Sequence, residues 1–145
     1  MERSTSSGSI ARTYALVFGI AYVAVAVVED VLGSSGLSVG GATILKVTPV
    51  QNAIHWLVGV AVLGSFFAGE AAARLVARIV GVVFVVVTLL GVFARHLTGE
   101  LLGFHGSLPW SYNVVHALTA VAALIAGFAV SKIYRTADAN PIRAA

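Results

Sequence analysis

The chain of 145 residues contains no cysteine and few charged side chains. Without cysteine, disulfides, thiolate metal sites and thiol nucleophiles are excluded. Charged residues make up 10% of the chain, whereas soluble domains contain about 25%. This composition argues against a disordered chain and against a typical soluble enzyme. A net charge of +3 without a basic cluster also argues against a nucleic-acid-binding protein.

Motifs of common catalytic sites are also missing from the sequence. It has no P-loop, no HExxH pair, no nucleophile elbow and no GxGxxG that follows a predicted strand. We therefore expect a protein that is not an enzyme, and the sequence indicates no substrate.

Apolar residues dominate what is present, at 59% of the chain. A membrane-spanning helix needs about 20 mostly apolar residues, and charged residues divide the chain into four such stretches. We predict helices at 11–31, 49–68, 74–95 and 109–133. The valine-rich runs are too long for strands, and an isolated span in lipid must be helical to satisfy its backbone. The fold class predicted is therefore all-α, an integral membrane four-helix bundle.

Basic residues predict the orientation of these spans. Four spans place both termini on one side, together with the loop between the second and third spans. That side carries seven of the nine basic residues, namely Arg3, Arg12, Arg74, Arg78, Lys132, Arg135 and Arg143, and the other side carries Lys46 and Arg95. Positively charged loops stay in the cytoplasm. We therefore predict a multi-pass protein of the cell membrane, with a cytoplasmic N-terminal segment (1–10) and a cytoplasmic basic tail (134–145).

The chain also resembles itself. The pattern Ala-Arg-x-x-small-x-Val-Phe at 11–18 returns at 77–84, and Asn-x-x-His-x-Leu at 52–57 returns at 113–118. Each repeat contains two spans, so the bundle is predicted to consist of two repeated helical hairpins in parallel orientation.

Polar residues gather at the predicted outer end of the bundle. Six residues there are candidates for a ligand site or a polar network. Glu29 and Arg95 lie at the ends of the odd-numbered spans, and the others lie at the starts of the even-numbered spans: Asn52, His55, Asn113 and His116. Asn and His at i and i+3 share one helix face. Polar groups at membrane depth tend to face the bundle interior, so we expect both histidines to point inward with their asparagines beside them.

Several interpretations of this cluster remain open. In the first interpretation, the polar residues form a structural network with helix capping, interhelical hydrogen bonds and a Glu29–Arg95 pair. In the second, His55 and His116 bind a b-type haem from diagonal helices, or they hold a divalent metal together with Glu29. A quinone or lipid pocket under the outer loops is a third. The sequence contains no local motif that selects one cofactor.

The two Asn-x-x-His motifs, with an Arg before each odd-numbered span, resemble the DUF4383 family, whose members are small bacterial four-helix membrane proteins. The resemblance covers residues 10–132 and rests on Asn52, His55, Gly59, Asn113 and His116; Ala120 replaces the glycine expected in the fourth span. It implies a fold and a location in the bacterial inner membrane, and it implies no activity.

These observations favour a structural, accessory or interaction protein of the lipid bilayer, either a homo-oligomer or a subunit of a larger membrane complex. The alternative is a redox or metal-binding membrane protein with its cofactor at His55 and His116.

Overall fold

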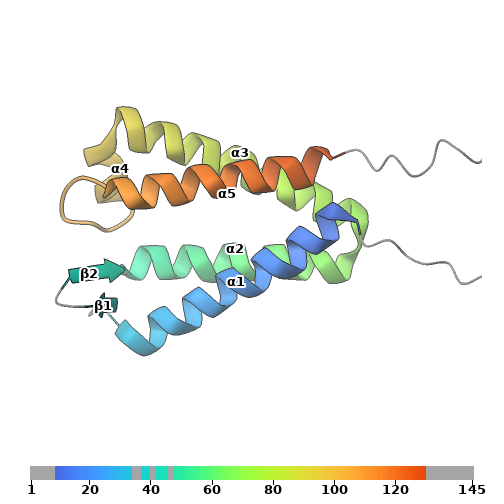
Figure 1. Ribbon diagram of the computed structural model, residues 1–145, viewed down its shortest axis with the longest axis horizontal. Helices are drawn as coiled ribbons and strands as arrows, with labels where there is room; N and C mark the ends of the chain where they lie inside the picture. Colours follow the sequence, from blue (N-terminus) through green and yellow to red (C-terminus); the bar gives the residue numbers. More distant parts are fainter. Residues whose placement is uncertain (1–8, 34–36, 40–41, 46–47, 130–145) are drawn as a thin grey trace, which may run out of the picture.

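The computed structural model describes residues 9–33, 37–39, 42–45 and 48–129 (Figure 1). Four of its helices are long and apolar enough to cross a membrane: α1 (Ile10–Leu32), α2 (Pro49–Ala68), α3 (Glu70–Phe93) and α5 (Trp110–Phe128). A short antiparallel hairpin of β1 (Leu37–Val39) and β2 (Ala42–Leu45) precedes α2, and a short helix, α4 (Arg95–Leu101), follows α3. The predicted set of four apolar spans is confirmed, and the all-α prediction omitted the two short strands.

Some predicted segments cannot be compared with this structure. Most of the predicted N-terminal segment (1–10), the end of the fourth predicted span (130–133) and the basic tail (134–145) lie outside the described residues.

Local sequence signals set the start of the first two spans. Ser9 caps α1 by accepting a hydrogen bond from the backbone N–H of Arg12 at 3.1 Å. Thr48 caps α2 in the same way, through the backbone N–H of Gln51 at 3.1 Å. Pro49 follows at the first helical position, where a helix needs no backbone N–H. Side-chain oxygens of this kind satisfy the free N–H groups of a helix start.

The third span differs from its predicted bounds at both ends. A loop was expected over 69–73, but Gly69 alone joins α2 to α3, with a φ of 104° that glycine adopts without steric cost. At its other end α3 stops at Phe93, because Ala94 leaves the helical conformation with φ −131° and ψ 47°. Arg95 therefore belongs to α4 and not to the end of the third span.

The four spans pack as two pairs, α1 with α2 and α3 with α5 (Figure 1). Glycine permits a close approach within each pair. A Cβ on Gly19 would lie 2.7 Å from backbone atoms of Leu63, and a Cβ on Gly127 would lie 2.9 Å from the backbone nitrogen of Arg78. Small residues of this kind let the backbones of membrane helices pack closely. Each pair is therefore a tightly packed helical hairpin.

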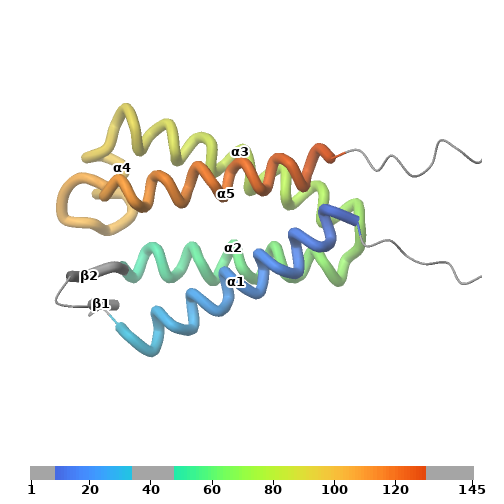
Figure 2. Tube along the Cα trace, in the orientation of Figure 1, coloured from blue at the N-terminus to red at the C-terminus, as the bar shows by residue number. Residues whose placement is uncertain are grey.

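The two pairs meet mainly at the end where α2 passes into α3. The core there consists mostly of alanine and valine around two aromatic rings: Ala11, Tyr14, Ala15, Val62, Ala73, Ala77, Val80, Phe84, Ala120, Ala123 and Ala126. Toward the opposite end the pairs diverge, as Figure 2 shows along the Cα trace. This divergence leaves room between the pairs for larger side chains.

The segment between α3 and α5, which the predicted spans leave as a loop, folds into a compact cap over residues 95–108. The backbone N–H of Leu108 donates to the carbonyl of Arg95 at 3.0 Å, and the Leu108 side chain is fully buried. The hydroxyl of Thr48 donates to the carbonyl of Leu102. This bond ties the cap, which belongs to the second pair, to the start of α2 in the first pair.

Candidate functional site

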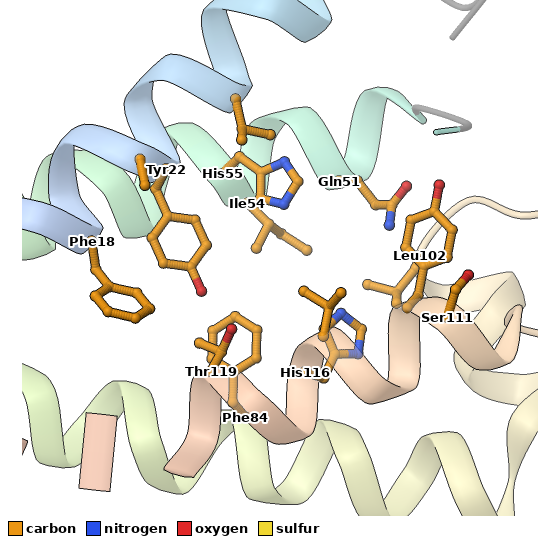
Figure 3. Close-up of a pocket in the computed structure, with 14 residues that line it drawn as sticks. Phe18, Tyr22, Gln51, Ile54, His55, Phe84, Leu102, Ser111, His116 and Thr119 are labelled. Atoms are coloured by element: carbon orange, nitrogen blue, oxygen red, sulfur yellow. The ribbon is translucent and has the colours of Figure 1, made fainter. Parts of the chain in front are cut away.

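A cavity of about 360 Å³ lies between the two helix pairs at their divergent end (Figure 3). All four long helices and Leu102 of the 95–108 cap line it. Its wall is mostly apolar and includes the aromatic rings of Phe18, Tyr22, Phe84 and Tyr112. Pockets for small molecules have volumes of about 300–1,000 Å³ and walls of this kind. The cavity therefore has the size and lining of a site for one small ligand.

Besides the two tyrosines, five polar side chains interrupt this apolar wall. Gln51 and His55 come from α2, and Ser111, His116 and Thr119 come from α5. Figure 3 shows the rings of His55 and His116 directed into the same space from opposite helix pairs. The two histidines of the repeated motif therefore face one cavity and not the outer surface of the molecule.

A carboxylate supports the first of these histidines. Nδ1 of His55 lies 2.8 Å from Oε2 of Glu29, near the end of α1. Glu29 is only 2% exposed, and a buried carboxylate is costly unless a partner compensates it. The hydrogen bond through Nδ1 fixes the ring and leaves Nε2 on the opposite edge. The ring of Tyr22 lies 6.0 Å from that of His55, centroid to centroid.

Two polar atoms on the cavity wall have no partner within the described part of the chain. They are Nδ1 of His116 and Oε1 of Gln51. Gln51 is 5% exposed, so water competes little for its amide. Buried polar groups are nearly always hydrogen-bonded, and an exception needs an explanation. Both atoms belong to residues that line the cavity, and each atom is itself buried, so the side chain must rotate before a ligand there can bond to it.

Asn52, one of the predicted site residues, lies on the rim and not in the cavity wall. Its side-chain N–H donates to Oδ1 of Asp30, and Nε1 of Trp56 donates to Oδ2 of the same carboxylate at 3.0 Å. Asp30 and Trp56 are exposed. This cluster joins the ends of α1 and α2 next to the Glu29–His55 pair, so it supports the site from outside.

Asn113 packs between α3 and α5, where it is buried against Gly91. A Cβ on Gly91 would come within 2.2 Å of the Asn113 Oδ1. The missing side chain of Gly91 therefore creates the space that Asn113 occupies. The two asparagines of the repeated motif thus have different surroundings, and neither of them lines the cavity beside its histidine, as was expected.

Arg95 also lies apart from the histidines. Its guanidinium group stacks over the ring of Trp110 at 5.3 Å, while Glu29 is bonded to His55. The break at Ala94 carries Arg95 into the 95–108 cap, so the expected Glu29–Arg95 pair is replaced by these two contacts.

The described residues do not form the metal site of the redox alternative. The described residues contain no group of three His, Cys, Asp or Glu side chains that could hold a metal ion, so His55, His116 and Glu29 do not form the expected ligand set. A cavity of about 150 Å³ holds one benzene ring. A cavity of about 360 Å³ therefore has room for a substituted ring.

Sequence reasoning missed several residues of this wall. Gln51 lies four residues before His55 and therefore shares its helix face, a signal that was available. Tyr22 and Phe84 lie within long apolar runs, where every position satisfies the requirement for a membrane span. Only the packing of the pairs shows that these two rings face the cavity.

One comparison with known proteins finds a match, and it covers the helical part of the chain. The family model described as a domain of unknown function (DUF4383) matches residues 12–129, which include the cavity and nearly all of the four spans. No curated protein and no solved structure matches the chain. Since the match covers most of its length, the chain belongs to the DUF4383 family.

Proposed function

We propose that this chain is a multi-pass membrane protein that binds one small, lipid-soluble ring molecule between its two helix pairs. One observation carries the proposal: Gln51 and His116, which each have a buried polar atom without a partner in the described residues, line an aromatic cavity. A third polar group, the His55 ring fixed by Glu29, faces the same space. A few convergent polar groups in an apolar pocket are typical of a ligand site.

A purely structural role explains these side chains less well. Structural polar residues in membrane helices bond to a neighbouring helix, as Glu29 does with His55. His116 instead contacts the ring of Phe84 at 5.6 Å between centroids, and its Nδ1 has no partner in the described residues. The arrangement therefore favours binding.

The rim of the cavity fits a ligand that arrives through the bilayer. Val25 of α1 and Val115 of α5 line the cavity and are 37% and 59% exposed. The cavity therefore opens between α1 and α5, on the side faces of helices that lie against lipid in a membrane. An apolar molecule dissolved in the bilayer would reach the site without crossing water.

The proposal includes the orientation indicated by the basic residues, with both termini in the cytoplasm and the 95–108 cap outside. The test is the labelling of single cysteines, since the chain has none of its own. A cysteine at Ser107 should react with an impermeant reagent added outside, and a cysteine at Ser6 should not. The opposite pattern would reverse the orientation.

We also propose that the two helix pairs are repeats of one hairpin. Arg12 lies over the ring of Phe66 at 4.8 Å, and Arg78 lies over the ring of Phe128 at 4.8 Å. Each contact joins the first helix of a pair to the second. These matched contacts support the similarity found between the two halves of the sequence.

Filling the cavity tests the proposed function. The variant Ala21→Phe adds a ring on the cavity wall, and Ala24→Phe, one turn further along α1, adds the same ring at a residue that does not line the cavity. In nanodiscs titrated with the single-ring probe para-hexylphenol, native mass spectrometry should find one bound probe on the wild type and on Ala24→Phe. Ala21→Phe should lose it. Equal binding by Ala21→Phe would overturn the proposal.

A further inference from the structure

The positions of the two histidines narrow the chemistry of the ligand. His55 lies six residues after the start of α2, and His116 lies six residues after the start of α5. Each closes an Asn-x-x-His motif. The rings enter the cavity from opposite helix pairs, with the aromatic side chains of Tyr22 and Phe84 near them (Figure 3). The site thus presents two like polar groups on opposite walls of an aromatic space.

The hydrogen-bonding capacity of each ring follows from its surroundings. Nδ1 of His55 bonds to the Glu29 carboxyl group, so Nε2 is the ring nitrogen that is left for a ligand. Nε2 donates a hydrogen bond in the tautomer that carries the hydrogen there. Neutral imidazole always carries one N–H, so His116 also has a donor. Both walls can therefore donate to acceptor oxygens of a bound molecule.

We infer that the cavity binds a para-quinone ring, with one carbonyl oxygen accepting from His55 and the opposite carbonyl oxygen from His116. This inference rests on the proposed function and specifies its ligand class. A para-quinone is flat, has two like acceptors at opposite ends, and requires one ring of space, as a cavity of about 360 Å³ provides. Its apolar tail leaves between Val25 and Val115, where the cavity opens toward lipid.

The decisive comparison uses two probes that differ in the number of carbonyl oxygens. Decylubiquinone has two ring carbonyls at opposite ends, and decylcyclohexenone has one. For the two-oxygen probe, either His55→Ala or His116→Ala removes one hydrogen bond and should weaken binding about three- to tenfold. The one-oxygen probe can turn toward whichever histidine remains. Each single variant should change its affinity by less than about twofold, and only the double variant should cause the full loss.

Two further variants guard against loss of folding. His55→Ala leaves Glu29 buried without its partner, so Glu29→Ala/His55→Ala removes the pair together and should give the same loss for decylubiquinone. His96→Ala changes an exposed histidine of the 95–108 cap and should bind both probes as the wild type does. All variants are compared in nanodiscs, where helical content by circular dichroism confirms that each is folded.

The outcomes separate this inference from the proposed function. Binding of neither probe, nor of para-hexylphenol, would refute the ligand site itself. Binding of both probes with equal losses for each single variant would leave the site standing and refute the two-ended recognition. The two-ended recognition of carbonyl oxygens would also be refuted if decylubiquinol, whose two hydroxyl groups replace the carbonyls, bound tenfold more tightly than decylubiquinone.

Discussion

Replacing Gly19 by alanine tests how closely α1 and α2 approach. An added Cβ would lie 2.7 Å from the Cα and the nitrogen of Leu63, whereas ordinary van der Waals contact begins at 3.4 Å. Because both neighbours are backbone atoms, no side chain can rotate away, and the helices must separate. A gap of about 0.5–1 Å forfeits a quarter to a half of the dispersion attraction between facing atoms. Overpacking of this kind costs about 1–3 kcal/mol.

A second glycine provides the matched control. Gly64 lies in α2, and a Cβ there would meet nothing within 4 Å. Both Gly→Ala changes gain about 1 kcal/mol of helix propensity, so this contribution cancels between them. The free energy of unfolding of Gly19→Ala should therefore lie about 1–3 kcal/mol below that of Gly64→Ala.

Unfolding in mixed micelles with increasing SDS, followed by circular dichroism, measures this difference. Gly64→Ala should unfold at the same SDS fraction as the wild type or at a higher one. If Gly19→Ala unfolded together with Gly64→Ala, the close contact between α1 and α2 would be wrong, and with it the description of each pair as a tightly packed hairpin.

Three other substitutions test the cap and the second pair by the same unfolding assay. Thr48→Val removes both the helix cap and the bond to the Leu102 carbonyl and should cost about 1–2 kcal/mol, while Thr48→Ser keeps both; equal losses would contradict the bond. Leu108→Ala should cost about 2–5 kcal/mol, since the side chain is fully buried, and a cost below about 1 kcal/mol would mean that the cap is not packed. Arg78→Lys should lose about 1 kcal/mol because Nε of Arg78 donates to the carbonyl of Gly127 at 2.8 Å, and a neutral effect would show that charge alone matters there.

The spans were predictable because apolar length alone defines them. The first two predicted ranges, 11–31 and 49–68, differ little from α1 and α2. The inward direction predicted for the histidines also agrees with the structure, which places both rings on the cavity wall. Polar residues inside a membrane have few alternatives, so their placement is strongly constrained.

The remaining features depend on contacts that no single segment encodes. Asn113 packs against α3 because Gly91, far away in the sequence, lacks a side chain. Arg95 moves into the cap because Ala94 leaves the helix, and alanine is otherwise a strong helix former. The folding of the cap itself depends on burial of Leu108, in a segment too short to show helical periodicity.

The single-residue connection at Gly69 has an evolutionary consequence. Each helix pair has its own internal glycine contacts, and one residue joins the pairs at the end where their shared core lies. The association of the two halves therefore depends little on the peptide bonds of Gly69. Two separate chains, one ending at Ala68 and one beginning at Glu70, should reassemble when they are produced in the same cell. Both hairpins of a parallel repeat enter the membrane in the same orientation. Under the proposed repeat, a two-helix ancestor that paired with a second copy of itself would need only duplication and fusion of its gene, without any inversion in the membrane, to give a chain of this kind.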